Sequence, residues 1–256
     1  MKAPPALIVL ALFLAAVPLR GQFQQREPDF DRQAQQQADT DRTWRAASEG
    51  FMQADKISYR SRAGDMDIPA WVFQPLKLRG AKGHPAIVWV HENIRGHLYV
   101  HYIPYIREAT AKGYVVIAPE YRGSIGYGKA FYEAIDYGGT PAEKHDLFRD
   151  RSPLYSVDKL QIPLLVHVAR NDEDVNIEEA MELVDALRSR KPFLAETKVY
   201  DSPPGGHTFD RRVDPRSWVP ENTREQRDSW NRVWTFLDWN LDPFRDGGAA
   251  AGTRQN

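Results

Sequence analysis

The sequence contains no cysteine among its 256 residues. The chain therefore forms no disulfide, has no cysteine for lipid attachment and has no thiol that could act as a nucleophile. Its stability has to come from packing alone. A dominant charge is missing as well, because 34 Lys and Arg residues balance 35 Asp and Glu residues, for a net charge of −1. Without a basic stripe that could follow a phosphate backbone, we expect no nucleic-acid partner.

The sequence also lacks an apolar run of about 20 residues, which is the length needed to span a bilayer. The apolar stretch at residues 7–17 is too short for that, and it follows the positive charge of Lys2. This arrangement predicts a signal peptide over residues 1–21, with cleavage near Gly21, and hence a secreted or periplasmic protein without membrane contact after cleavage. An uncleaved anchor is the alternative, because Leu19 is large for its place before the cleavage site.

Apolar residues are scarce at both ends of the remaining chain. Residues 22–50 are rich in Gln, Asp and Arg, and residues 243–256 have a similar polar character. Such segments bury too little surface to offset the entropy lost on ordering. We therefore expect a flexible or loosely helical linker over 22–50, one folded domain over 51–242 that begins near Phe51, and a disordered tail over 243–256.

Between these ends, patterns typical of strands alternate with patterns typical of helices. Such alternation predicts an α/β fold with a mostly parallel sheet. The expected strands are a hairpin at 56–61 and 68–73, followed by 86–90, 114–118, 162–168 and 197–200. The expected helices are 104–112, 129–137, one from Thr140, one after Asn176 and one after Thr223, and the last has an apolar stripe with Trp230 and Trp234 that we assign to the core.

Two polar residues follow successive strands near the C-terminal end. Asp172 lies in an acidic loop after the strand at 162–168, and His207 lies in a Gly-Gly turn after the strand at 197–200. A carboxylate and then a histidine in these places are how an α/β-hydrolase supplies its acid and base, and the nucleophile precedes both in the chain. The remaining question is whether a nucleophile stands before Asp172.

Four segments carry a family resemblance. They are the glycine-rich loop 122–128, Ser-Pro-Leu-Tyr at 152–155, the acidic loop 172–175 and Gly-His-Thr-Phe at 206–209. In this order they resemble prolyl oligopeptidase-type serine peptidases of the dipeptidyl-peptidase or acylaminoacyl-peptidase branch, over roughly residues 85–241. The resemblance implies an α/β-hydrolase-type domain, peptide or small ester substrates and no cofactor, with Asp172 as the triad acid and His207 as the triad base. The His-Glu-Asn stretch at 91–93 more weakly resembles dienelactone hydrolases.

The nucleophile of such a hydrolase is missing. In this fold the serine sits in Gly-x-Ser-x-Gly on a turn between strand and helix, and the chain contains no such motif. About forty residues separate Gly128 from Asp172, although a strand–helix–strand unit alone needs about thirty and this gap already holds other elements. We infer that the nucleophile strand, its turn, the following helix and one more strand are absent, so the domain is internally truncated.

Other serines fit the nucleophile pattern poorly. Ser124 follows a predicted strand, but its context is Arg-Gly-Ser-Ile-Gly, and Arg122 occupies the position where the tight turn needs a small residue. Ser152 and Ser156 have no flanking glycine, which is typical of turn or cap residues.

Metal sites were weighed and none is expected. Residues 172–183 begin like a calcium loop, but Ile177 and Leu183 replace the required Gly and Glu. His91 and Glu92 resemble the start of a zinc motif, but Arg95 stands where the second His belongs. His97 and His101, four residues apart, leave a weak possibility of a shared metal.

Three functional hypotheses stay open at this point. The chain is a prolyl oligopeptidase-family serine hydrolase by descent that is inactive alone. Alternatively, it is an active esterase or dienelactone-hydrolase-like enzyme that uses Ser124. In the third hypothesis the scaffold serves as a binding or dimerising protein, consistent with a homo-oligomer.

Overall fold

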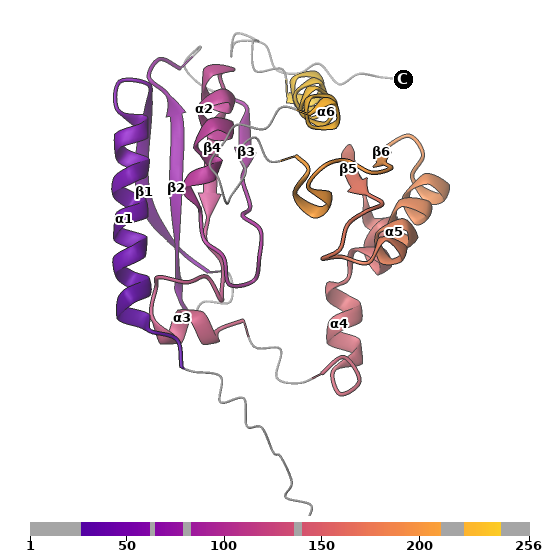
Figure 1. Cartoon of the computed structure of the whole chain (residues 1–256), viewed down its shortest axis with the longest axis horizontal. Coiled ribbons are helices and arrows are strands. Elements are labelled where there is room, and N and C mark those ends of the chain that lie inside the picture. Colours follow the sequence, from indigo (N-terminus) through magenta and orange to yellow (C-terminus); the bar gives the residue numbers. More distant parts are fainter. Residues whose placement is uncertain (1–26, 62–64, 79–82, 136–139, 211–222, 242–256) are drawn as a thin grey trace, which may run out of the picture.

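The computed structural model describes residues 27–61, 65–78, 83–135, 140–210 and 223–241, and the expected signal peptide (1–21) and tail (243–256) lie outside these ranges. Figure 1 shows two groups of strands with helices around them. In chain order the elements are α1 (Phe30–Ser48), β1 (Met52–Arg60), β2 (Asp67–Pro75), β3 (Ala86–Val88), η1 (Val100–Tyr102), α2 (Ile103–Ala111), β4 (Val115–Pro119), α3 (Lys129–Glu133), α4 (His145–Arg151), η2 (Pro153–Lys159), β5 (Leu164–Ala169), α5 (Ile177–Arg190), β6 (Ala195–Tyr200), η3 (Gly206–Thr208) and α6 (Arg224–Leu241).

The first sheet has the strand order β1-β2-β4-β3. The predicted hairpin is confirmed, because β1 and β2 pair antiparallel in a register that runs from Met52 opposite Pro75 to Arg60 opposite Asp67. Strand β2 also pairs antiparallel with β4, whereas β3 pairs parallel with β4. Strand β3 ends at Val88, two residues before the predicted end, and it forms one edge of the sheet.

Helix α1 occupies most of the segment expected to be a flexible or loosely helical linker, residues 22–50, and it is packed on the first sheet. The helix begins after Asp29, whose side chain accepts a hydrogen bond from the Arg32 N–H, and it lies along β1 (Figure 1). Trp44 is fully buried against Phe73, and its Nε1 donates to the Leu98 carbonyl. The average polarity of the segment did not predict a packed helix, because a single large aromatic side chain, Trp44, provides most of its buried contact.

The second sheet consists of the parallel strands β5 and β6. Helix α5 packs on it through Val184 and Leu187, and its predicted cap is confirmed, because the Asn176 side chain accepts from the Glu178 N–H. The helix expected from Thr140 begins later, at His145, although Glu143 does accept hydrogen bonds from the backbone N–H and hydroxyl of Thr140.

Helix α6 joins the two sheets, and Figure 1 shows it lying above the space between them. Trp230 and Trp234 are buried with the side chains of the first sheet, as the stripe predicted, while the helix also contacts β5. These elements confirm the α/β-hydrolase-type prediction. The expected mostly parallel sheet is corrected, because the strands form two sheets and the first has two antiparallel pairings and one parallel pairing. No described strand pairs with the second edge of β3 or of β5, so both edges stay open.

None of the helices in the described ranges has the length and apolarity needed to cross a membrane.

Candidate active site

The structure brings Asp172 and His207 together. The Nδ1 atom of His207 lies 2.9 Å from the Oδ2 atom of Asp172, and each residue follows the carboxyl end of its strand, β5 or β6. Because the two strands are parallel, their carboxyl ends meet at one edge of the sheet. The other carboxylate oxygen of Asp172, Oδ1, accepts 2.9 Å hydrogen bonds from the backbone N–H groups of Asp174 and Val175. These two hydrogen bonds fix the orientation in which the Asp172 carboxylate meets the imidazole.

The surroundings of Asp172 favour its charged form. Partial burial raises the pKa of this carboxyl, but the Val175 N–H, the His207 ring and the Asp174 N–H outweigh burial and hold the pKa below its usual value. A carboxylate that stays ionised can orient an imidazole and stabilise it once it has taken up a proton.

Steric crowding explains why glycine occupies position 206 in the Gly-Gly turn. Gly206 has a φ of +50°, and a Cβ atom at this position would lie 2.7 Å from the Asn171 carbonyl oxygen. Asn171 in turn donates from its side chain to the Pro203 carbonyl. The turn that carries His207 is therefore packed directly on the loop that carries Asp172, and only a residue without a side chain allows this approach.

A cavity of about 260 Å³ lies beside His207. One side of its lining is aromatic, and polar side chains surround the rest. The lining residues are Trp89, Val90, Glu92, His101, Tyr102, Tyr105, His207, Thr208, Asp210 and Trp230. The sequence pattern favoured a core position for Trp230 over a ligand-binding aromatic site, and in the structure Trp230 both packs in the core and lines the cavity.

The described residues supply no serine to this cavity. No hydrogen bond in the described part of the chain joins His207 to a serine or threonine hydroxyl, and Ser152 and Ser156 belong to the α4–η2 region outside the lining. Thr208 does line the cavity, but its hydroxyl is directed to the Gly205 carbonyl at 3.3 Å. Asp172 and His207 therefore have no nucleophilic partner among the described residues.

Ser124 lies in a separate, buried network. Its side chain is fully buried, and its Oγ atom lies 3.1 Å from the Nε2 atom of His91 and accepts from the Tyr121 N–H. The same Nε2 atom lies 3.1 Å from Glu120, while Nδ1 faces the Glu92 carbonyl. A catalytic histidine uses one nitrogen for the nucleophile and the other for the acid. Because one nitrogen here meets both groups, this trio holds the loop together and is not arranged as a triad.

His97 and His101, the two histidines considered for a shared metal, each face a partner within the fold. His97 is buried with its Nδ1 atom 2.7 Å from the Gln37 side-chain oxygen, and burial lowers its pKa. His101 lies on η1, 3.4 Å from the Glu92 carboxylate. Within the described ranges, no group of three or more His, Asp or Glu side chains is placed to hold a metal ion.

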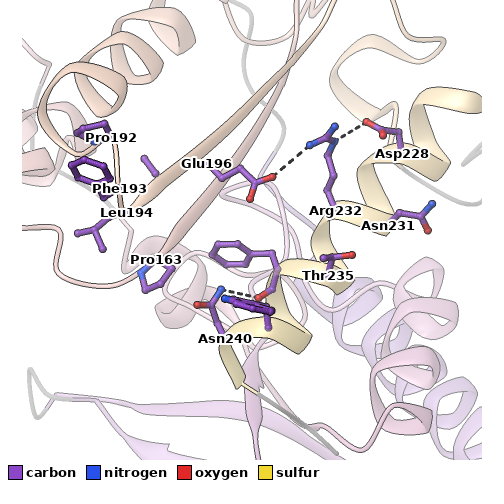
Figure 2. A pocket seen from close by; sticks show the side chains of 13 residues that line it. Pro163, Pro192, Phe193, Leu194, Glu196, Asp228, Asn231, Arg232, Thr235 and Asn240 are labelled. Atoms are coloured by element: carbon purple, nitrogen blue, oxygen red, sulfur yellow. Dashed lines mark hydrogen bonds and ion pairs between the residues drawn. The ribbon is translucent and has the colours of Figure 1, made fainter. Parts of the chain in front are cut away.

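A larger hollow of about 730 Å³ lies at the opposite end of β5 and β6. Figure 2 shows Phe193 and Leu194 on one wall and helix α6 on another, where Arg232 forms ion pairs with Glu196 and Asp228. Its lining begins with Pro163, ahead of β5, whereas Asp172 and His207 follow the other ends of the strands. Although this hollow is larger than the cavity beside His207, its position does not support it as the active site.

Comparison with known proteins finds a family match in the second half of the chain. Residues 136–243, which include both Asp172 and His207, match the prolyl oligopeptidase family. Over these residues the chain is similar to that family. This confirms the family resemblance that the sequence motifs predicted, although the match by itself does not test the roles of the two residues.

Individual relatives agree with this family. The uncharacterized peptidase YuxL of Bacillus subtilis is 24% identical over 64% of this chain and 37% of its own length. A solved acylaminoacyl peptidase in complex with Z-Gly-Gly-Phe-chloromethyl ketone superposes with a TM-score of 0.59, at 15% identity, over 77% of this chain and 43% of the other. The chain thus spans less than half the length of the peptidases that it matches.

The weaker resemblance is confirmed as a likeness of fold. A dienelactone hydrolase from Klebsiella pneumoniae superposes with a TM-score of 0.52, at 18% identity, over 73% of this chain and 98% of the other. At such low identity, the solved structures establish the α/β-hydrolase-type fold and leave the substrate undecided.

Proposed function

We propose that the chain carries the acid–base pair of a prolyl oligopeptidase-type serine hydrolase directed at peptide or small ester substrates, and that it does not turn over a peptide by itself. The observation that supports this proposal is the 2.9 Å contact between Asp172 and His207, made without any serine partner among the described residues. We further propose that the protein is exported, on the strength of the signal-peptide pattern at residues 1–21.

The chemistry of the pair explains both parts of the proposal. In a serine hydrolase, the histidine removes the proton of the serine hydroxyl, and the acid stabilises the imidazolium that forms. Removing the serine costs about six orders of magnitude in turnover, even when the other two groups remain. We therefore expect the lack of a nucleophile to prevent turnover even though the acid–base pair is well formed.

A labelling experiment tests the inactivity. The purified protein is incubated with a fluorophosphonate probe, and hydrolysis of a fluorogenic peptide amide is followed in parallel. We expect neither stoichiometric labelling nor turnover above the rate of a His207→Ala variant. Labelling of one serine, lost when that serine alone is changed to alanine, would contradict the proposal.

A grafting experiment tests the acid–base roles. The Gly-x-Ser-x-Gly strand–turn–helix segment of a full-length family peptidase is inserted before Thr140, where the chain passes from α3 to α4. We expect the graft to react with the probe and to lose that reactivity in the Asp172→Ala and His207→Ala backgrounds. A reactive graft that is indifferent to both changes would show that these residues are not the acid and base.

Self-association is a second candidate function, favoured by the open edge of the first sheet. Val88, Val90 and Ile94 at and after β3 are 63%, 63% and 62% exposed. Exposed apolar residues at an unpaired strand edge promote pairing with another chain. Size-exclusion chromatography with light scattering over a hundredfold range of concentration tests this, and a monomer throughout that range would reject it.

A further inference from the structure

We propose that the cavity beside His207 binds a small organic cation, namely an ammonium group attached to a flat or short apolar body. As a statement about substrate, the proposal rests on the proposed hydrolase function, because the bound cation would then be the charged end of a substrate whose reacting bond lies at His207. As a statement about binding, it needs no turnover.

The aromatic wall of the cavity is the first reason. The rings of Trp89 and Trp230 are parallel, 3° apart in orientation, with centroids separated by 6.4 Å. Tyr102 and Tyr105 lie 5.6 and 5.8 Å from the Trp89 ring, and Tyr105 also packs on Trp230. All four of these residues line the cavity. The electron-rich faces of such rings attract cations, and tryptophan does so most strongly.

The charge of the lining is the second reason. Two of the lining residues, Glu92 and Asp210, are acidic, whereas none of the described residues that line the cavity is a lysine or an arginine. The backbone N–H of Glu92 donates to the Tyr102 hydroxyl at 3.1 Å, which holds the main chain of Glu92 beside the aromatic wall. His101 lies 3.4 Å from Glu92 and flanks it on η1. An ammonium group would thus meet a carboxylate and aromatic faces together.

The size of the cavity limits the ligand. Its volume of about 260 Å³ is smaller than the pockets of about 300–1,000 Å³ that hold drug-sized molecules. It therefore suits one amino-acid side chain or a group of similar size. His207 and Thr208 form one of its walls, so a group held there sits directly next to the imidazole.

A series of three ligands tests the proposal on the unmodified protein. Phenethylammonium, 2-phenylethanol and phenylacetate share nearly the same apolar body but differ in charge. Binding is measured by isothermal titration calorimetry at pH 8 and low salt. We expect the cation to bind at least about tenfold more tightly than the neutral alcohol and the anion to bind more weakly than both. Equal affinities for the cation and the alcohol would overturn the proposal.

Two matched variants locate the binding. Glu92→Gln keeps the shape of the side chain and removes its charge, and we expect it to lower the affinity for the cation to that for the alcohol. Glu196→Gln, in the other hollow, is the control, and we expect no change. A cation preference that Glu92→Gln leaves intact would also overturn the proposal. Should Glu92→Gln not fold, the ligand series on the unmodified protein still decides.

The results separate this inference from the proposed function. Cation binding without peptide turnover supports both. The absence of cation binding rejects the inference alone, because the acid–base roles are measured independently by probe labelling of the grafted protein. Serine-dependent turnover of a peptide amide by the ungrafted chain rejects the proposed inactivity and leaves the binding result unaffected.

Discussion

The indole rings of Trp89 and Trp230 lie parallel with their centroids 6.4 Å apart, and they connect the end of β3 to helix α6. Trp230 also donates from Nε1 to the Asp210 carbonyl, close to the turn that carries His207. The same indole thus packs against the first sheet, lines the cavity and holds the end of the loop that carries the candidate base. Several consequences of this arrangement and of the site can be measured.

Replacing Trp230 with alanine should destabilise the fold strongly. The side chain is 8% exposed, so its removal leaves a large void and takes away the donor to Asp210. We expect a loss of about 3–5 kcal/mol in the free energy of unfolding. Urea denaturation measures it. Trp239→Ala on the same helix is the matched control, because Trp239 is 74% exposed, and it should change stability by less than about 0.5 kcal/mol. Similar losses in both variants would contradict this packing.

Replacing Gly206 with alanine should separate His207 from Asp172. The new Cβ atom would lie 2.7 Å from the Asn171 carbonyl oxygen, and a φ of +50° is strained for alanine. We expect a loss of about 1–2 kcal/mol and a changed imidazole resonance for His207 in ¹⁵N–¹H spectra. Gly50→Ala is a control that also has positive φ but meets no atom within 4 Å, so it should strain the backbone without moving the His207 signal. An unchanged signal in Gly206→Ala would show that the turn tolerates a side chain.

The free energy of unfolding should decrease at acidic pH, because protonation of His167 is less favourable in the folded protein than in the unfolded chain. Burial, then the charge of Arg232, lowers the pKa of His167 to about 4, and its Nδ1 atom meets the Ser229 hydroxyl at 2.9 Å. Asp228 opposes this shift, while Lys198 adds to it. The unfolded chain takes up the proton first, at a pKa of about 6.5, so this contribution is complete above pH 6.5 and is lost as the pH falls toward 4.

Denaturation curves between pH 4 and 8 measure this dependence, which we expect to amount to about 1–2 kcal/mol. A His167→Gln variant should show a flatter profile over the same range. His145→Gln provides the control, because this side chain is 71% exposed and its removal should leave the profile unchanged. A profile that His167→Gln does not flatten would assign the acid sensitivity to other groups.

Replacing Ser124 with alanine should affect stability and leave probe chemistry unchanged. The change deprives the Tyr121 N–H and the His91 ring of a buried partner, for a loss of about 1–3 kcal/mol. Because the side chain is fully buried, we expect the unmodified protein and this variant to show the same absence of fluorophosphonate labelling. Labelling that disappears specifically in Ser124→Ala would show that the buried serine becomes accessible and reactive.

Local patterns predicted much of the fold and part of the site. Alternating residues predicted the β1–β2 hairpin, and the asparagine before α5 predicted its cap. The order of Asp172 and His207, each following its own strand, predicted two side chains that the structure places 2.9 Å apart. The hairpin and the cap are confirmed because strand pairing and capping depend on residues that are close in the sequence, whereas the catalytic roles of Asp172 and His207 stay a prediction.

Other features could not be predicted in this way. Helix α1 folds because Trp44 finds Phe73 and the Leu98 carbonyl, neither of which is near it in the sequence. The burial of Ser124 could not be predicted either, because His91 and Glu120, which lie close to it, come from different strand ends. Glu92 and Trp230 meet in one cavity although 230 − 92 = 138 positions separate them.

The sequence by itself determined the order of strands and helices, the acid and histidine at two strand ends, and the lack of a Gly-x-Ser-x-Gly turn, because these are properties of short segments. Only the tertiary structure decided that the strands form two sheets, that α6 joins them and that aromatic and acidic side chains enclose a cavity beside His207. Enclosure depends on contacts between distant segments, and composition or periodicity along the chain carries no record of which distant segments meet.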